Sequence, residues 1–292
     1  MDIDFFYGPV AYIDLLGFSD YIRKNERDKI GERVGGFAEA VRQATALVTL
    51  PVEPGVRDKP LSVNFDYAIF SDSLVLYQWM YGYTINWKRG MQVRHEWGAL
   101  KEMLSVCSRL SFLLLQMGQP FRGCITRGEY CAHKDPEGRG IIVAGKPVIE
   151  AYELEGRQDW IGIVLHKDAY KEQDTEEQLS QRARSHAKQT LSVGWDYLWP
   201  HIVDWCDKVP VSSKRGIADH KEQGFYAVVP SRKDDGTVGQ AIESIQQARE
   251  ALLLARDSSQ GALRKYDATE EWYKKIEDEL VSSRKQRTTE WP

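Results

Sequence analysis

The amino-acid sequence predicts an α+β fold, in which one mixed β-sheet carries helices on one face. Two segments have apolar residues at helical spacing, residues 27–48 and residues 96–117. Two pairs of β-prone runs, residues 61–77 and residues 121–144, alternate with these helices, and a polar turn breaks each pair. Helices that alternate with antiparallel hairpins are typical of this fold class, and the other face of the sheet is left open for a site or a partner.

The chain begins with a strand and a turn around which the remaining elements are organised. Residues 9–16 are a short apolar run that carries Asp14, and Gly17, Phe18 and Ser19 then open a helical pattern. A carboxylate at the end of a strand can hold a metal ion, and the free N–H groups of a helix start can bind a phosphate. The first strand and its turn are therefore the first candidate site.

The later part of the chain changes character after residue 170. Before this point the sequence also predicts a loop at 82–95, a helix at about 147–155 and a strand at 160–165. After it, the sequence predicts a polar helical stretch at 171–190, a strand at 225–229, an amphipathic helix from about residue 240 and a charged helix at about 262–287. We therefore divide the chain into a core, residues 1–170, and a helical C-terminal extension with some strand, residues 171–292, packed on that core.

Composition and charge exclude several classes of protein. The chain has 42% hydrophobic and 28% charged residues, as soluble globular proteins do. Its net charge of −4 comes from mixed signs, which argues against a nucleic-acid partner. No window approaches the roughly 18 apolar residues of a membrane span, and no signal peptide is recognisable. The four cysteines lack the spacing of a zinc site, so we expect reduced thiols and a cytoplasmic location.

Two aspartates lie within or between apolar strands, where a charged side chain is unusual. Asp14 lies inside an apolar strand, and Asp72 lies in the turn between two apolar strands. Buried carboxylates are costly unless they are paired, hydrogen-bonded or bound to a metal. Two of them can hold two divalent ions that grip a triphosphate and activate an attacking oxygen. For Asp72 an ordinary turn role is the alternative, whereas Asp is depleted inside strands such as that of Asp14.

Four blocks of the sequence, in the same order, resemble the motifs of the class III nucleotide cyclases. Residues 11–19 resemble the first metal-binding strand and turn of that family, and residues 70–74 resemble its second metal-binding turn. Residues 122–129 resemble its Arg-x-Gly-Ile-x-x-Gly-Glu strand, and residues 145–155 resemble the helix that follows. The resemblance covers about residues 9–165. It implies that residues 1–170 are a catalytic core with a cyclase-like, ferredoxin-like sheet.

The resemblance also implies an activity and a set of ligands. It implies a cyclase that converts a nucleoside triphosphate into a 3′,5′-cyclic monophosphate and pyrophosphate, with active sites at the interface of a head-to-tail homodimer. Asp14 and Asp72 match the positions that hold two Mg²⁺ or Mn²⁺ ions, and Leu15 matches a carbonyl ligand. The positions whose backbone N–H groups match a phosphate cradle are Gly17, Phe18 and Ser19.

The sequence departs from the family pattern where the family reads the base and stabilises the transition state. Ala68 stands at the position of the purine-selecting lysine, and Ile142 at the position of its partner. Ile149 stands at the asparagine and Glu153 at the transition-state arginine. Three residues are candidate replacements for that arginine: Arg122, Arg127 and Lys146. For each of them a solvated or salt-bridged surface cation is the ordinary alternative.

These departures resemble one branch of the family, the bacterial pyrimidine cyclases of the Pycsar anti-phage system. Those enzymes make cyclic UMP or cyclic CMP, and the diffusible product activates a separate effector, so the resemblance implies UTP or CTP as substrate. Tyr67, beside the altered lysine position, is a candidate base selector, although a strand aromatic packed into the core is an equal alternative. A purine cyclase and a catalytically degenerate nucleotide-binding signalling domain both remain open.

Overall fold

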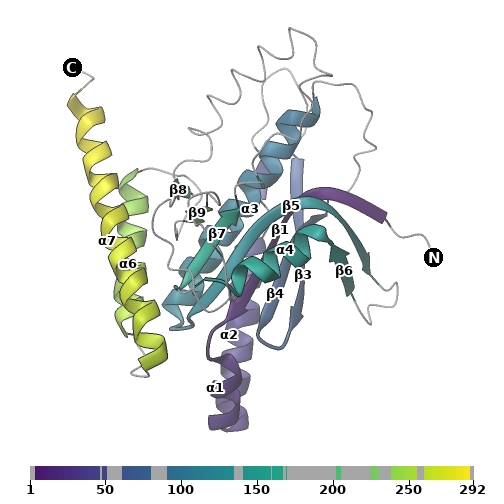
Figure 1. Cartoon of the computed structure of the whole chain (residues 1–292), viewed down its shortest axis with the longest axis horizontal. Coiled ribbons are helices and arrows are strands. Elements are labelled where there is room, and N and C mark those ends of the chain that lie inside the picture. The colour runs from purple at the N-terminus through teal and green to yellow at the C-terminus, as the bar shows by residue number, and fades with distance from the viewer. Residues whose placement is uncertain are drawn as a thin grey trace.

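The computed structural model of the chain contains one mixed sheet with helices packed on it (Figure 1). The residues that it describes are 4–46, 48–50, 61–79, 91–134, 141–158, 160–166, 169, 202–204, 225–228, 230, 238–254 and 260–289. The expected polar helix at 171–190 lies outside these residues, and the core boundary at residue 170 stays a prediction. Among the described helices, none has the length and apolar character that crossing a membrane requires.

The elements follow the predicted alternation of strands and helices. In chain order they are β1 (Asp4–Leu15), α1 (Phe18–Lys24), α2 (Arg27–Thr45), β2 (Val48–Leu50), β3 (Leu61–Phe70), β4 (Ser73–Trp79), α3 (Met91–Gln116), β5 (Phe121–Lys134), β6 (Ile141–Gly145), α4 (Lys146–Glu155), β7 (Gly162–His166), β8 (Ile202–Asp204), β9 (Phe225–Val228), α6 (Val238–Leu254) and α7 (Gln260–Thr289). One expectation is wrong: the predicted loop at 82–95 ends earlier, because α3 already begins at Met91. Residues 91–95 contain no glycine or proline that would stop a helix there.

The sheet is built around its first strand. The strand order is β2-β3-β4-β1-β5-β7-β9-β8, and β6 pairs with β5. β1 is antiparallel to both of its neighbours, β4 and β5, whereas β5 and β7 are parallel. The predicted α+β class with a mixed sheet is therefore confirmed.

The two faces of the sheet are covered by different helices. Along β1, Ala11, Ile13 and Leu15 point into the main apolar core, which α2 and α3 share. Tyr12 and Asp14 alternate with them and point to the other face, where the ring of Tyr12 meets a tyrosine of α4. Helices thus lie on both faces rather than on one, and the face with α4 is the face that carries Asp14.

The helix α4 has a built seat on β5. The hydroxyl of Thr126 donates a hydrogen bond to the carbonyl oxygen of Pro147, at 2.6 Å. Two residues further along β5, Gly128 leaves room for the Pro147 ring, which would lie 3.3 Å from a Cβ atom at that position. Sequence patterns did not predict this second covered face, because both contacts join segments that are distant in the chain.

The C-terminal helices pack on the core. α6 lies against α3, and α7 lies against α6, so that the two form the yellow and green pair in Figure 1. Leu252 of α6 and Trp272 and Tyr273 of α7 are buried in the same apolar cluster as β1. The Trp272 ring meets the Trp160 ring edge-on, with centroids 5.2 Å apart. The extension therefore reaches the segment that joins α4 to β7.

A glycine in the middle of the sheet provides a test of this packing. A Cβ atom at Gly123 of β5 would lie 2.9 Å from the backbone oxygen of Tyr12 and 3.1 Å from the Ile163 side chain. Overpacking of this kind costs about 1–3 kcal/mol, so we expect Gly123→Ala to lower the free energy of unfolding by that amount in urea titrations. Gly35→Ala is the control, because nothing lies within 4 Å there and alanine favours the helix. Equal stability of both variants would contradict the packing described here.

Candidate active site

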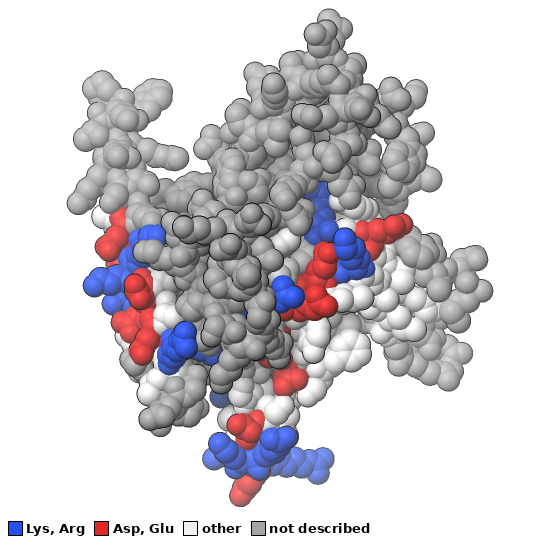
Figure 2. All heavy atoms as spheres, in the orientation of Figure 1, with Lys and Arg blue, Asp and Glu red and all other residues white. Residues whose placement is uncertain are grey.

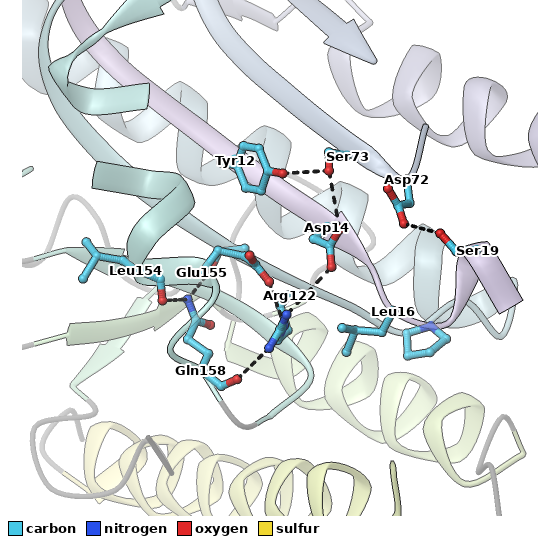
Figure 3. A network of polar contacts seen from close by, with 12 residues as sticks. Tyr12, Asp14, Leu16, Ser19, Asp72, Ser73, Arg122, Leu154, Glu155 and Gln158 are labelled. Carbon is cyan, nitrogen blue, oxygen red and sulfur yellow. Dashed lines mark hydrogen bonds and ion pairs between the residues drawn. The ribbon is translucent and has the colours of Figure 1, made fainter. Parts of the chain in front are cut away.

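The candidate site forms at one end of the strands, where β1 ends and where α1, β4 and β5 begin (Figure 3). In the strand register, Asp14 of β1 lies opposite Ser73 of β4 on one side and opposite Arg122 of β5 on the other. Residues directly opposite each other in antiparallel strands share a face of the sheet. The register therefore places these three side chains together on the face that α4 covers.

The second predicted aspartate lies at the tip of the β3–β4 hairpin, as the turn chemistry indicated. Ser71 adopts a left-handed conformation, with φ of 57°, that makes the tight turn. The backbone oxygen of Asp72 accepts a hydrogen bond from the N–H of Leu15, at 2.8 Å. This bond ties the hairpin tip to the end of β1, so the two predicted carboxylates come from adjacent points of the structure.

Asp14 is a half-buried carboxylate with a polar network around it. The hydroxyl of Tyr12 donates to the Oγ of Ser73 at 2.7 Å, and that Oγ donates to Asp14 Oδ1 at 3.4 Å. Burial raises the pKa of Asp14 above its ordinary value, and the negative charge of Asp72 raises it further, while Arg122 opposes the shift. The folded protein thus concentrates negative charge at a place where a cation would relieve it.

The Gly17–Ser19 turn lies beside the second carboxylate. Gly17 has φ of 73°, a left-handed conformation that suits glycine, and α1 begins directly after it. Phe18 is buried in the main core and anchors the turn, whereas Ser19 is exposed. The Oγ of Ser19 donates to Asp72 Oδ2 at 2.9 Å. The structure therefore brings the predicted phosphate-cradling turn and the predicted metal ligands together.

Arg122 is the predicted cation that lies at this site. Its Nε is 2.7 Å from Glu155 Oε1, its Nη1 donates to the backbone oxygen of Gln158 at 3.0 Å, and its Nη2 is 3.8 Å from Asp14 Oδ2. The arginine side chain is 18% exposed. The guanidinium is thus held along two edges, and its third nitrogen faces the aspartate (Figure 3).

Glu155 at the end of α4 is a site residue that sequence reasoning missed. Its side chain is only 5% exposed. Burial, and the nearby charge of Asp14, raise the pKa of Glu155 to about 7, although the Arg122 guanidinium attracts the charged form. A signal was present in the sequence: Glu155 follows Ala151 by one helical turn, on the buried side of the helix. Tyr12, Ser73 and Gln158 were missed as well.

The raised pKa of Glu155 makes a prediction about stability and pH. A carboxyl whose pKa is about 7 in the folded protein and about 4.5 unfolded stabilises the fold at low pH. That contribution, up to roughly 3 kcal/mol, is lost as the pH rises from about 4.5 through 7. We expect Glu155→Gln to flatten this decline in urea titrations at pH 5.5 and pH 8, with Glu153→Gln as the exposed control. Parallel curves for wild type and Glu155→Gln would contradict the assigned shift.

Three other predicted residues lie away from Asp14. Tyr67 pairs with Leu76 and packs into the main core on the opposite face, as the core-aromatic alternative had it. Arg127 stacks on the ring of Tyr7 at 5.1 Å, and it is an odd-numbered step from Arg122 along β5, which puts it on the opposite face. Lys146 is 84% exposed, pairs with Glu150 at 3.4 Å and starts the helix that Glu155 ends.

The positions that depart from the family pattern are mostly exposed. Ile149 and Glu153 lie on the outer side of α4, and Ile142 of β6 is exposed as well. Ala68 is opposite Val75, on the face that carries Asp14. A methyl group therefore occupies the place on this face where the family has a long cationic side chain.

The oxygen ligands available here suit a hard divalent cation. The two carboxylates of Asp14 and Asp72 and the carbonyl of Leu15 are the kind of ligands that Mg²⁺ and Mn²⁺ bind, and these ions keep water or substrate oxygens in their other positions. Within the part of the chain that the structure describes, no group of three or more histidine, cysteine, aspartate or glutamate side chains forms a complete metal cage.

Comparisons with known proteins give matches among solved structures. No protein-family model matches the chain, and no curated protein matches it. Among solved structures, it is similar to the adenylyl cyclase CyaB from P. aeruginosa, with 13% identity, a TM-score of 0.45, and coverage of 81% of this chain and 100% of that chain. It is also similar to the guanylyl cyclase Cya2, with 10% identity, a TM-score of 0.38, and coverage of 78% and 94%. The guanylyl cyclase domain of the RhoGC fusion protein from the aquatic fungus Blastocladiella emersonii is similar too, with 8% identity, a TM-score of 0.42, and coverage of 78% and 98%.

Proposed function

We propose that this chain is a metal-dependent nucleotide cyclase. One observation carries the proposal: the register of β1 with β4 and β5 joins Asp14, Asp72 and the Gly17–Ser19 turn at one edge of the sheet. These are the residues of the first two sequence blocks that resemble the class III cyclases, and they lie far apart in the chain. A carboxylate pair beside a turn with free N–H groups suits a triphosphate bound through divalent ions.

In this proposal the residues of the chain bind and orient the substrate for an internal attack. Two Mg²⁺ or Mn²⁺ ions on Asp14 and Asp72 would neutralise the triphosphate and make the 3′-hydroxyl of the nucleotide more acidic. Backbone N–H groups of residues 17–19, at the start of α1, would bind the phosphates. Arg122 places a positive charge next to Asp14. The 3′-hydroxyl then attacks the α-phosphorus in line, which forms the cyclic phosphodiester and releases pyrophosphate.

We further propose a pyrimidine triphosphate, UTP or CTP, as the substrate. The first support is Ala68, which stands at the position of the family's purine-selecting lysine, on the face that carries Asp14. The second is the exposed Ile142, which stands at the position of that lysine's polar partner and cannot replace it. A site that lacks a hydrogen-bonding pair loses its means of preferring a purine edge. The product would be a diffusible second messenger for a separate effector in anti-phage defence. A purine cyclase is the second candidate, with other residues reading the base.

We propose that the active form is a head-to-tail homodimer. Ile149 on the outer side of α4 is 59% exposed, and so is Tyr152, although its ring meets Tyr12 of the sheet. Phe70 next to the hairpin tip is exposed as well. Figure 2 shows charged side chains along α4 and a patch of uncharged side chains next to them. Exposed apolar groups of this size are typical of protein interfaces. A second copy would cover them and would bring its own α4 towards the nucleotide.

The deciding experiment is incubation of the purified protein with each of UTP, CTP, ATP and GTP in the presence of Mn²⁺. We expect cyclic UMP or cyclic CMP, identified by chromatography and mass spectrometry, and no product after addition of EDTA. Cyclic AMP or cyclic GMP instead would select the purine candidate. Tight nucleotide binding in calorimetry with no cyclic product from any nucleotide would refute the enzyme and leave a nucleotide-binding signalling domain.

A further inference from the structure

The C-terminal helix α7 is bound to the segment that follows α4. The hydroxyl of Thr269, which is fully buried, accepts a hydrogen bond from the backbone N–H of Ile161 at 2.8 Å. The same hydroxyl donates to the backbone oxygen of Lys265 at 2.7 Å, one turn earlier in α7. One turn of α7 is thereby fixed to the short segment that leads into β7.

The neighbouring Trp160 passes this contact towards the candidate site. Its ring packs edge-on against Trp272 of α7, and its indole N–H donates to Oε1 of Gln158 at 2.9 Å. The other end of the Gln158 amide donates to the backbone oxygen of Gly123 in β5, also at 2.9 Å. Both polar atoms of a buried amide are therefore in use, so the Gln158 side chain has one orientation only.

Gln158 also makes contact with the functional arginine. Its backbone oxygen accepts a hydrogen bond from Arg122 Nη1 at 3.0 Å, and Glu155 holds Arg122 Nε at 2.7 Å. The remaining nitrogen, Nη2, is 3.8 Å from Asp14. A guanidinium is planar and rigid, so the hydrogen bond at Nη1 and the ion pair at Nε together restrict where the third nitrogen lies. Figure 3 shows the arginine between this turn and Asp14.

We propose that Gln158 and Thr269 are positioning residues, through which the helix α7 aims Arg122 at the candidate active site. The inference rests on the proposed function, because that function gives Arg122 its role at the active site. The inference also makes the C-terminal extension part of the structure that supports this site. In this arrangement, Thr269 fixes Ile161, the adjacent Trp160 fixes Gln158, and Gln158 fixes the guanidinium.

The charge on α7 agrees with this arrangement. The positive charge of Lys265 acts to lower the pKa of both Asp14 and Glu155, although the net shift of each group is upward. Lys265 can do so because it lies one turn from Thr269, the residue that is fixed to Ile161. α7 therefore approaches the carboxylates of the site as well as the turn that holds Arg122.

The test compares Thr269→Val, which removes the hydroxyl and keeps the shape, with Thr269→Ser, which keeps the hydroxyl. Glu271→Gln, an exposed change on the same helix, is the surface control. The first readout is the side-chain Nε–H resonance of Arg122 in ¹⁵N NMR spectra of the full chain, assigned by its loss in Arg122→Lys. We expect Thr269→Val to shift or broaden this resonance and the other two variants to leave it in place.

The second readout is turnover of the nucleotide that the wild type cyclises. We expect Thr269→Val to lower kcat about tenfold or more with KM changed less than about threefold, because charge at the transition state affects kcat. Thr269→Ser and Glu271→Gln are expected to stay within about twofold of wild type. Should Thr269→Val fail to fold in circular dichroism, Gln158→Met, which removes both amide contacts, takes its place.

A wild-type Arg122 resonance in a folded Thr269→Val or Gln158→Met protein overturns the inference, and so does a wild-type kcat. The two proposals fail in different ways. If the wild type turns over no nucleotide, the proposed function is refuted, while the NMR comparison still decides whether α7 positions Arg122.

Discussion

Replacing Asp14 with Asn is expected to reduce cyclase turnover by about a thousandfold or more while the protein keeps its fold. The asparagine has the same size and can still accept the hydrogen bond from Ser73, but it lacks the charge that holds a divalent ion. Because burial and Asp72 raise the pKa of Asp14, the charged form is disfavoured in the folded protein. We therefore expect the melting temperature of the variant to equal or exceed that of wild type.

The control for this experiment comes from the same region. Asp20 on α1 is an exposed aspartate that pairs with Arg23 at 3.5 Å, so Asp20→Asn should leave both turnover and stability unchanged. Asp72→Asn should behave as Asp14→Asn does. Wild-type turnover in either of the two site variants, measured with saturating Mn²⁺, would remove the metal pair from the proposed mechanism.

Replacing Arg122 with Met is expected to lower kcat about a hundredfold to a thousandfold and also to destabilise the protein. Loss of one partner of a buried ion pair costs about 3–5 kcal/mol, because the other charge stays buried and uncompensated. Here that partner is Glu155, whose pKa is about 7. The loss of stability should therefore be larger at pH 8, where Glu155 is charged, than at pH 6, where it holds a proton.

A double variant separates the two effects of Arg122. Arg122→Met combined with Glu155→Gln removes the stranded charge, so unfolding in urea should return towards wild type while turnover stays low. Arg127→Met, on the opposite face of β5, is the matched control and should retain turnover. If Arg127→Met loses activity and Arg122→Met keeps it, the assignment of the functional cation is wrong.

Much of the core was predictable, because its elements follow local patterns. The apolar run of β1, the turn chemistry around Asp72 and the helical spacing of α2 each depend on neighbours in the sequence. The carboxylate pair was predictable too, since both aspartates stand where a charge is unusual or in a motif that resembles a known family. The turn at Gly17 and the helix start directly after it followed from the same motif.

The choice among the three candidate cations could not be made from the sequence. Arg122 and Arg127 are an odd number of residues apart, so a strand must send them to opposite faces. Which face holds the site depends on the register of β5 with β1, and that register has no local signal. Lys146 begins α4, whereas Glu155, which lies near Asp14, ends it, so the length of the helix separates Lys146 from the site. The position of α4 depends on its contact with Thr126, and the sequence does not reveal that contact.

The roles of Glu155, Gln158 and Thr269 were invisible for a related reason. Each acts through a partner that is distant in the chain: Arg122 for the first two residues, Ile161 for the third. Periodicity marks a residue as buried or exposed, but it does not name the group that the residue will meet. For Glu155 and Thr269, a polar residue on the buried side of a helix is the sequence signal that would have drawn attention to them.

Because β1 lies in the middle of the sheet, the site at its end can form during synthesis only after both neighbouring strands have been made. β1 precedes both of its neighbours in the chain: β4 begins at Ser73, and β5 ends only at Lys134. One edge of this apolar strand therefore stays unpaired until β4 is made and the other until β5 is made, which slows folding and exposes the nascent chain to aggregation. Asp14 gains Arg122 only when the β1–β5 pair closes. A ribosome-bound chain that stops before residue 121 should therefore leave the β1 amides on the β5 side unprotected in hydrogen exchange, whereas the released protein should protect them.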